Sequence, residues 1–284
     1  MSPHPLHYRC VAPDAAQPPA WMAIAHGLLG SGDNWASVAR ELVRRRPDWG
    51  VVLPDLRMHG NSQGAPPPHT LDAAAADLAA LAEKLAAAGR PVWAAAGHSL
   101  GGKVVLALRA SRQIPLRQVW VLDASPGVCE GCALDPESPV VRILAALEEL
   151  PPTFDQRADF VEEMVGRGFP KIVAQWLAKN LEREGGVYRF ALDLGAMRAL
   201  LEDYHARDLW MEAGDLLAGE TVRFAVAGAS QVVSSADRTR LRAIEAESGG
   251  QLGVHLLEGA SHWLHMDARS ALLDLMAREL PRMD

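Results

Sequence analysis

Ser99 stands at the centre of a Gly-x-Ser-x-Gly pattern, Gly97-His98-Ser99-Leu100-Gly101. An apolar run at 91–96 precedes the pattern, and a helix-like run at 103–110 follows it. This succession predicts a strand, a sharp turn with the serine at its apex, and a helix. Glycines two residues before and after the serine would let strand and helix pass close together. A hydroxyl displayed in this way is suited to nucleophilic attack on an acyl carbonyl.

A serine nucleophile needs a base, and His262, which follows the apolar run 251–257, is the candidate. Neutral imidazole, with an unperturbed pKa of about 6.5, accepts a hydroxyl proton near neutral pH. Asp123 ends the apolar run 118–122. A carboxylate at that position would hold the far ring nitrogen and stabilise the imidazolium that forms.

The loop His26-Gly27-Leu28-Leu29-Gly30 follows another apolar run, 21–25. It stands where an acyl hydrolase needs a loop beside the serine turn to supply an oxyanion donor. The backbone N–H groups of Leu28 and Leu100 would bind the negative charge that develops on the carbonyl oxygen. Each such donor is worth roughly 3 kcal/mol.

Four blocks of the chain together resemble serine esterases of the α/β-hydrolase superfamily. They are HGLLGSGDNW at 26–35, DLRMHGNS at 55–62, GHSLGGK at 97–103 and GASHW at 259–263. Within the superfamily, the chain is similar to the subgroup that contains the bacterial YbfF esterases, the ABHD11-type hydrolases and their plant relatives. The chain order serine, acid, histidine is that of α/β-hydrolases. One departure is Ser261, which replaces the glycine commonly found before the histidine.

Three aspartates compete for the acid role. Many α/β-hydrolases carry the acid after the penultimate strand, but the segment 228–234 contains no carboxylate. Asp123 is favoured, and its position is similar to the one used in the YbfF type. Asp193 lies in a stretch that resembles the one credited with the acid in the ABHD11 type, and Asp237 lies just past 228–234. For these two, the alternative is an ordinary surface or helix-cap aspartate.

Gly27 and three tryptophans are candidates for substrate contact. Trp35 and Trp263 adjoin the proposed catalytic loops, where they would either line an acyl pocket or pack in the core. Trp176 belongs to an apolar face at helical spacing, where core packing is again the alternative. The resemblance implies hydrogen bonds that stabilise loops for His26 and His98.

The elements that position these residues alternate between strand and helix, which predicts a mostly parallel sheet covered by helices on both faces. Expected strands are 21–25, 50–53, 92–96, 119–122, 221–227 and 251–257. Expected helices are 34–45, 71–88, 102–110, 237–247 and 268–280. The carboxyl ends of such strands form the active edge of the sheet, and all the catalytic candidates fall there.

The alternation of strand and helix stops between residues 125 and 217. We call this stretch the inserted segment. Short amphipathic helices are expected at 140–150, 156–165, 171–181 and 196–204. Because some ninety residues far exceed an ordinary connection, the inserted segment is predicted to be a helical lid over the strand ends. The core would then comprise residues 1–124 and 218–284.

Composition limits the remaining possibilities. The 284 residues carry a net charge of −7, which argues against a nucleic-acid partner because phosphate binding needs a basic surface. The first twenty residues lack a signal-peptide core and no run approaches the ~20 apolar residues of a membrane span, so a cytoplasmic protein is expected. Nothing indicates whether it is a monomer or a dimer.

No cofactor is expected, and no metal. Cys129-Glu130-Gly131-Cys132 has the spacing of a redox or zinc motif, but no second pair completes a zinc site. Three cysteines do not make a disulfide framework. His262 and His265 lie three residues apart without a His-Glu-x-x-His motif.

The sequence thus predicts a serine hydrolase that cleaves small to medium acyl esters or thioesters through an acyl-enzyme. Fold and triad do not set the substrate, so carbon–carbon bond hydrolysis, perhydrolysis or a lyase-type step are alternatives. A non-catalytic ligand-binding protein of the same fold is a further alternative.

Overall fold

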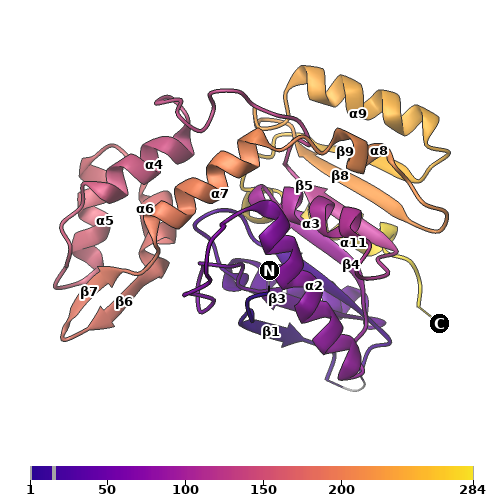
Figure 1. Cartoon of the computed structure of the whole chain (residues 1–284), viewed down its shortest axis with the longest axis horizontal. Coiled ribbons are helices and arrows are strands. Elements are labelled where there is room, and N and C mark those ends of the chain that lie inside the picture. Colours follow the sequence, from indigo (N-terminus) through magenta and orange to yellow (C-terminus); the bar gives the residue numbers. More distant parts are fainter. Residues whose placement is uncertain (1, 15–16, 284) are drawn as a thin grey trace.

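The computed structural model describes residues 2–14 and 17–283 and has a seven-stranded sheet at its centre (Figure 1). The strands lie side by side in the order β1-β3-β2-β4-β5-β8-β9. Neighbouring strands are parallel except β1 and β3, which are antiparallel. Their bounds are Tyr8–Val11 for β1, Ala20–Ala25 for β2, Trp49–Pro54 for β3, Val92–His98 for β4, Gln118–Leu122 for β5, Thr221–Ala227 for β8 and Leu252–Leu257 for β9.

Helices cover both faces of the sheet, as the sequence predicted. In β2, residues 21, 23 and 25 belong to one core cluster and residues 20, 22 and 24 to the other. Successive side chains of a strand point to opposite faces, so a strand buried on both sides is a continuous apolar run. The first cluster includes helices α2 (Leu71–Ala87), α3 (Leu100–Ser111) and α9 (Ser235–Glu247), and the second includes α1 (Ala36–Arg45) and α11 (Arg269–Glu279).

The inserted segment lies between β5 and β8 and contains the four expected helices. Figure 1 shows α4, α5, α6 and the β6–β7 hairpin gathered to one side of the sheet, with α7 leading back toward it. The division into a core and a separate lid domain stays a prediction. The bounds are α4 Pro139–Glu148, α5 Arg157–Gly166, α6 Lys171–Leu177, the short 3-10 helix η2 Ala178–Asn180, β6 Leu181–Glu184, β7 Val187–Phe190, α7 Leu194–Ala206 and α8 Trp210–Gly214.

The β6–β7 hairpin was not expected from the sequence, which indicated helix as far as residue 181. Gly185 and Gly186 form its turn, and both have positive φ, 58° and 94°. Two glycines of this kind are a standard connection between antiparallel strands. The sequence reading also missed β1, the short helix α8 and α10 (Leu264–Asp267).

The two connections that join the inserted segment to the core run side by side. The outgoing connection follows β5, and the returning one follows α7. Leu209 N–H donates to the Pro126 carbonyl at 2.9 Å, and Cys129 N–H donates to the His205 carbonyl at 2.9 Å. The chain therefore leaves and re-enters the core at one place.

Lys103, on α3, ties these connections to the core. Its side chain is almost fully buried, and Nζ donates to the carbonyls of Gly127, Tyr204 and Arg207 at 2.7, 2.6 and 2.7 Å. Burial lowers the pKa of Lys103 to about 8. Three carbonyls replace the water that the ammonium loses, which is the condition for burying a charge.

In the described part of the chain, no helix is both long enough and apolar enough to cross a membrane.

Candidate active site

Ser99 occupies the turn between β4 and α3 in a backbone conformation that few residues other than glycine adopt. Its φ is 53° and its ψ is −117°. Such strain costs of order 1–3 kcal/mol and persists only where the surroundings impose it. Here Ser99 N–H donates to the Leu122 carbonyl at 3.0 Å, which fixes the turn against β5.

The flanking glycines are required by close packing. A Cβ on Gly97 would overlap the Gly101 carbonyl, and a Cβ on Gly101 would come within 2.5 Å of the Ala25 carbonyl oxygen. Strand and helix therefore touch through bare backbone, as the Gly-x-Ser-x-Gly pattern predicted. Ser99 itself is partly exposed, and its hydroxyl makes no hydrogen bond to another described residue.

Asp123 and His262 lie in contact at the carboxyl ends of β5 and β9. Asp123 Oδ2 is 2.7 Å from His262 Nδ1, with Asp123 fully buried and the His262 side chain 31% exposed. Asp123 Oδ1 accepts the Ala227 N–H at 3.0 Å. Since the carboxylate faces Nδ1, that nitrogen carries the proton and Nε2 is left as the basic atom.

The other two candidate acids are helix caps. Asp193 is exposed and accepts the Ala196 N–H at 3.0 Å at the start of α7. Asp237 accepts the Ser234 N–H at 3.3 Å in a capping box that opens α9. Both therefore have the ordinary role that aspartates of this kind have at helix starts. Of the three aspartates, Asp123 is the one hydrogen bonded to His262.

His98 links the serine turn to the loop that carries His262. Its Nε2 donates to the His262 carbonyl at 2.8 Å, and the two rings lie 4.6 Å apart between centroids. Burial, and then the neighbouring His262, hold the pKa of His98 well below its ordinary value. A neutral His98 is therefore a structural tie between residues 99 and 262.

The loop that carries Leu28 is held by His59. Leu29 has a φ of 62°, and its N–H donates to His59 Nε2 at 3.1 Å. His59 Nδ1 in turn donates to the Arg57 carbonyl at 2.9 Å. Burial lowers the pKa of His59 to about 3, so the ring stays neutral and can accept. This contact between two loops was not expected from the sequence.

His26 makes the reciprocal contact between the same two loops. Its Nδ1 donates to the Gly27 carbonyl at 2.8 Å, and its Nε2 accepts the Leu56 N–H at 2.9 Å. Burial lowers the pKa of His26 as well. Two neutral imidazoles thus hold the loop rigidly beside Ser99.

Two backbone donors remain open at this position. In the part of the chain that the structure describes, neither the Leu28 nor the Leu100 N–H bonds to another residue. Leu100 is the first residue of α3, where the N–H has no partner inside the helix. A Cβ on Gly27 would lie 3.4 Å from Ser99 Cβ and 3.1 Å from His98 Nδ1. Glycine at position 27 therefore leaves space beside the serine.

The three tryptophans lie in different surroundings. Trp35 is 1% exposed and stacks on His265 with 4.7 Å between ring centroids. It offers no accessible surface to a ligand in this structure, so of its two expected roles, pocket lining and core packing, Trp35 has the second. Trp176 of α6 and Trp263 are half-buried and meet edge to face at 4.6 Å.

The inserted segment touches both loops of the candidate site. Trp176 contacts Trp263, the residue after His262, and Asn180 Nδ2 donates to the Leu29 carbonyl at 2.9 Å. Asn180 was missed from the sequence because nothing local marks a partner 151 residues away.

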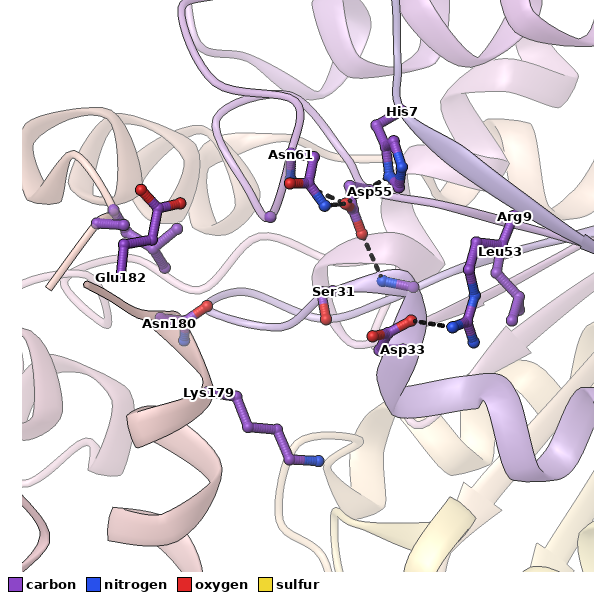
Figure 2. A pocket seen from close by; sticks show the side chains of 14 residues that line it. His7, Arg9, Ser31, Asp33, Leu53, Asp55, Asn61, Lys179, Asn180 and Glu182 are labelled. Atoms are coloured by element: carbon purple, nitrogen blue, oxygen red, sulfur yellow. Dashed lines mark hydrogen bonds and ion pairs between the residues drawn. The ribbon is translucent and has the colours of Figure 1, made fainter. Parts of the chain in front are cut away.

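A polar cavity of about 350 Å³ lies at this junction (Figure 2). Lys179, Asn180 and Glu182 of the inserted segment line it opposite Asp55 and Asn61 of the core. The cavity is lined by neither Ser99 nor His262. It therefore marks where the two parts of the chain meet rather than the position of an acyl group.

Comparison with known proteins agrees with the geometry. The model of the alpha/beta hydrolase family matches residues 23–275. The mouse protein named sn-1-specific diacylglycerol lipase ABHD11 is 26% identical over 280 residues, covering 96% of this chain and 84% of the mouse protein. Esterase YbfF of Escherichia coli is 27% identical over 276 residues, covering 91% of this chain and 92% of that protein.

A solved structure supports the same fold. The structure described as a marine microorganism esterase superposes with a TM-score of 0.79 at 24% identity, covering 97% of this chain and 99% of the other. The resemblance to the YbfF and ABHD11 types is thus confirmed, and so is the predicted fold. The chain belongs to the alpha/beta hydrolase family, as an esterase-like enzyme.

Proposed function

We propose that this chain is a serine esterase that hydrolyses small to medium acyl esters or thioesters through an acyl-enzyme. The observation that carries the proposal is the 2.7 Å contact between buried Asp123 and His262, next to the strained turn at Ser99. The names of the relatives, esterase and diacylglycerol lipase, support an acyl ester as the small-molecule substrate.

The first half of the reaction forms the acyl-enzyme. His262 Nε2 takes the Ser99 hydroxyl proton while Oγ attacks the acyl carbonyl carbon. The carbonyl oxygen becomes an oxyanion, which the Leu28 and Leu100 N–H groups bind. When the intermediate collapses, the carbon–oxygen or carbon–sulfur bond to the leaving group breaks, and His262 gives its proton to the alcohol or thiol.

The second half releases the acid. His262 takes a proton from water as the water oxygen attacks the acyl carbon, and the same two N–H groups bind the second oxyanion. Collapse returns the proton to Ser99 Oγ and frees the carboxylic acid. Asp123 keeps its charge throughout and stabilises the imidazolium in both halves.

The inserted segment would act as the lid of this site. Its contacts to Leu29 and Trp263 put it against the loops that carry the oxyanion donor and the base. We propose that Trp176 and Trp263, together with Gly27, form the wall that the acyl group meets. A covered apolar wall favours short and medium chains over lipid at an oil interface.

The decisive experiment is to replace Ser99 by alanine and compare it with Ser235→Ala, an exposed serine at the start of α9. Ser99→Ala should lose at least ~10⁴-fold in turnover of a broad panel of acyl esters and thioesters, because the nucleophile is gone. Ser235→Ala should behave as the wild type. A fluorophosphonate should label the wild type at Ser99 alone, as read by peptide mass spectrometry.

Other outcomes would point elsewhere. Wild-type rates in Ser99→Ala, or a label on another serine, contradict the mechanism. A single turnover without release of product would favour a ligand-binding protein that has kept its triad.

A further inference from the structure

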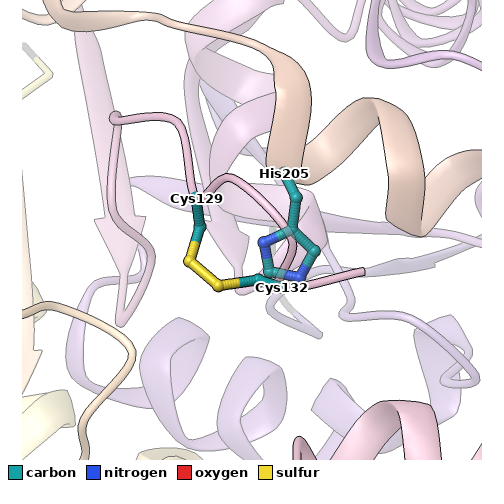
Figure 3. Close-up of side chains that lie close together, drawn as sticks. All are labelled: Cys129, Cys132 and His205. Atoms are coloured by element: carbon teal, nitrogen blue, oxygen red, sulfur yellow. A yellow bond between two sulfur atoms is a disulfide. The ribbon is translucent and has the colours of Figure 1, made fainter. Parts of the chain in front are cut away.

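Two cysteines and one histidine converge outside the candidate active site. Figure 3 shows the side chains of Cys129, Cys132 and His205 close together. Their ligand atoms all lie within 4.8 Å of one another. Cys129 is exposed, and the other two are half-buried. Among the described residues, no other group of three His, Cys, Asp or Glu side chains is arranged in this way.

A tight turn places both sulfurs on the same side. Cys132 N–H donates to the Cys129 carbonyl at 3.3 Å, and Gly131 supplies the positive φ, 76°, that the turn needs. The two Cα atoms are 5.5 Å apart, and the structure joins the sulfurs in a disulfide. Cys129 N–H donates to the His205 carbonyl, so the turn is attached to the end of α7 where the third donor stands.

The imidazole of His205 packs edge to face on the ring of Tyr204, with 5.0 Å between the ring centroids. Its Nε2 is buried without a hydrogen-bond partner. Buried polar atoms are almost always paired, and an unpaired one calls for an ion or a water. A disulfide alone uses two of the three groups and leaves the ring nitrogen unexplained.

We propose that the reduced chain binds one Zn²⁺ through Cys129 Sγ, Cys132 Sγ and a ring nitrogen of His205. Two thiolates and an imidazole suit Zn²⁺, and water would complete four-coordination. Binding releases the two thiol protons, since thiolate is the ligand. The disulfide seen here is the two-electron-oxidised alternative, which withdraws both sulfurs from the metal.

The location suggests what the metal does. Cys129 and Cys132 lie on the outgoing connection of the inserted segment, and His205 lies in the last turn of α7, just before the returning connection. Zn²⁺ would fasten the two connections at the place where Lys103 already holds them. This goes beyond the proposed ester hydrolysis, in which no metal takes part, and is independent of it.

This proposal departs from the sequence-based expectation that the chain binds no metal. That expectation relied on the lack of a second cysteine pair. The third donor is a histidine 73 residues after Cys132, in no motif, and only the folded chain brings it near.

The test uses the full chain, reduced by a non-thiol phosphine and freed of metal by dialysis. Zn²⁺ is titrated against a chromophoric chelator, and Co²⁺ serves as a spectroscopic probe. We expect one equivalent to bind, with a thiolate-to-cobalt charge-transfer band. Cys132→Ser should abolish the band, and His205→Gln should weaken Zn²⁺ binding by more than the ~10–100-fold that loss of an outer partner costs.

Two controls make these losses specific. Cys10→Ser removes the third, free cysteine, and His255→Gln removes another ring nitrogen that is buried without a partner. Both should bind Zn²⁺ as the wild type does. The disulfide form should bind none until it is reduced. Circular dichroism verifies that each variant is folded. Alkylation of the reduced wild type with N-ethylmaleimide blocks the thiols without mutation and should also prevent Zn²⁺ binding.

The proposal fails if the reduced chain, with three titratable thiols, binds no Zn²⁺. It also fails if His205→Gln binds as tightly as the wild type, or if the disulfide form binds equally well. Ester turnover is not needed as a readout, so loss of the proposed esterase activity would leave this result interpretable.

Discussion

At the scale of single residues, Asp123 bonds to groups from two directions. One carboxylate oxygen accepts a backbone N–H of β8, and the other faces His262. The residue has a φ of 46°, in the left-handed region that aspartate tolerates better than most. A buried carboxylate with both oxygens bonded is held in one rotamer, which is what orientation of an imidazole requires.

Asp123→Asn should lower ester turnover by ~10³–10⁴-fold, because an amide that donates to Nδ1 selects the wrong tautomer of His262. Asp193→Asn and Asp237→Asn are matched controls, since their side chains cap helices. They should change turnover little and cost at most ~1 kcal/mol of stability. Steady-state kinetics with thermal unfolding separates the two effects, and a large loss in either control would reassign the acid.

The residues of the site differ in how far the sequence could locate them. Ser99 and His262 belong to local patterns, and Asp123 follows a recognisable strand. Their contacts depend on the fold. The bond from Leu29 to His59 spans 30 residues and the bond from Asn180 to Leu29 spans 151, and no local periodicity encodes either one.

At the scale of elements, α6 presents two kinds of side chain. Trp176 is half-buried against Trp263, whereas Ile172 on the same helix is 57% exposed. The helical spacing of apolar residues predicted an apolar face that includes Trp176, but spacing alone does not say which neighbouring element such a face meets. The β6–β7 hairpin was missed for the same reason: its strands pair because of their turn and their packing, and the spacing of apolar residues reports neither.

Trp176→Ala should change the ratio of kcat/KM between short and medium acyl esters by about 10-fold, since the loss of a wall side chain alters pocket volume. Ile172→Ala is the control on the same helix and should leave the ratio unchanged. An acyl-chain panel measured on both variants tests the lid. An unaltered profile in Trp176→Ala would remove the inserted segment from substrate selection.

At the scale of the whole molecule, several buried histidines are neutral in the folded state. Burial lowers the pKa of His26 and His98, that of His59 to about 3 and that of His265 to about 4. In the unfolded chain each would titrate near 6.5. Below that pH the unfolded state binds more protons than the folded state, so stability rises with pH.

The free energy of unfolding should therefore fall as the pH drops from about 6.5 toward 4, by up to ~1.4 kcal/mol per pH unit for each histidine. His265→Phe keeps the aromatic ring that stacks on Trp35 and removes one titrating group. Urea unfolding at several pH values should give a shallower slope for this variant. An identical slope would show that His265 titrates alike in both states.

Pro126 and Leu209, at the two ends of the inserted segment, are hydrogen bonded to each other, and this affects how easily the segment can be replaced during evolution. A loop whose ends already touch can be exchanged for another at little cost in chain entropy, since doubling its length adds only about 0.6 kcal/mol. The substrate range can then change when the inserted segment is replaced, while the sheet and the triad stay the same. Lys103 is the exception, because its buried charge is stabilised by the carbonyls of Gly127 and Tyr204, which belong to the inserted segment. An inserted segment that does not supply those carbonyls would require an apolar residue at position 103. The residue type at position 103 should therefore match the inserted segment that the core carries.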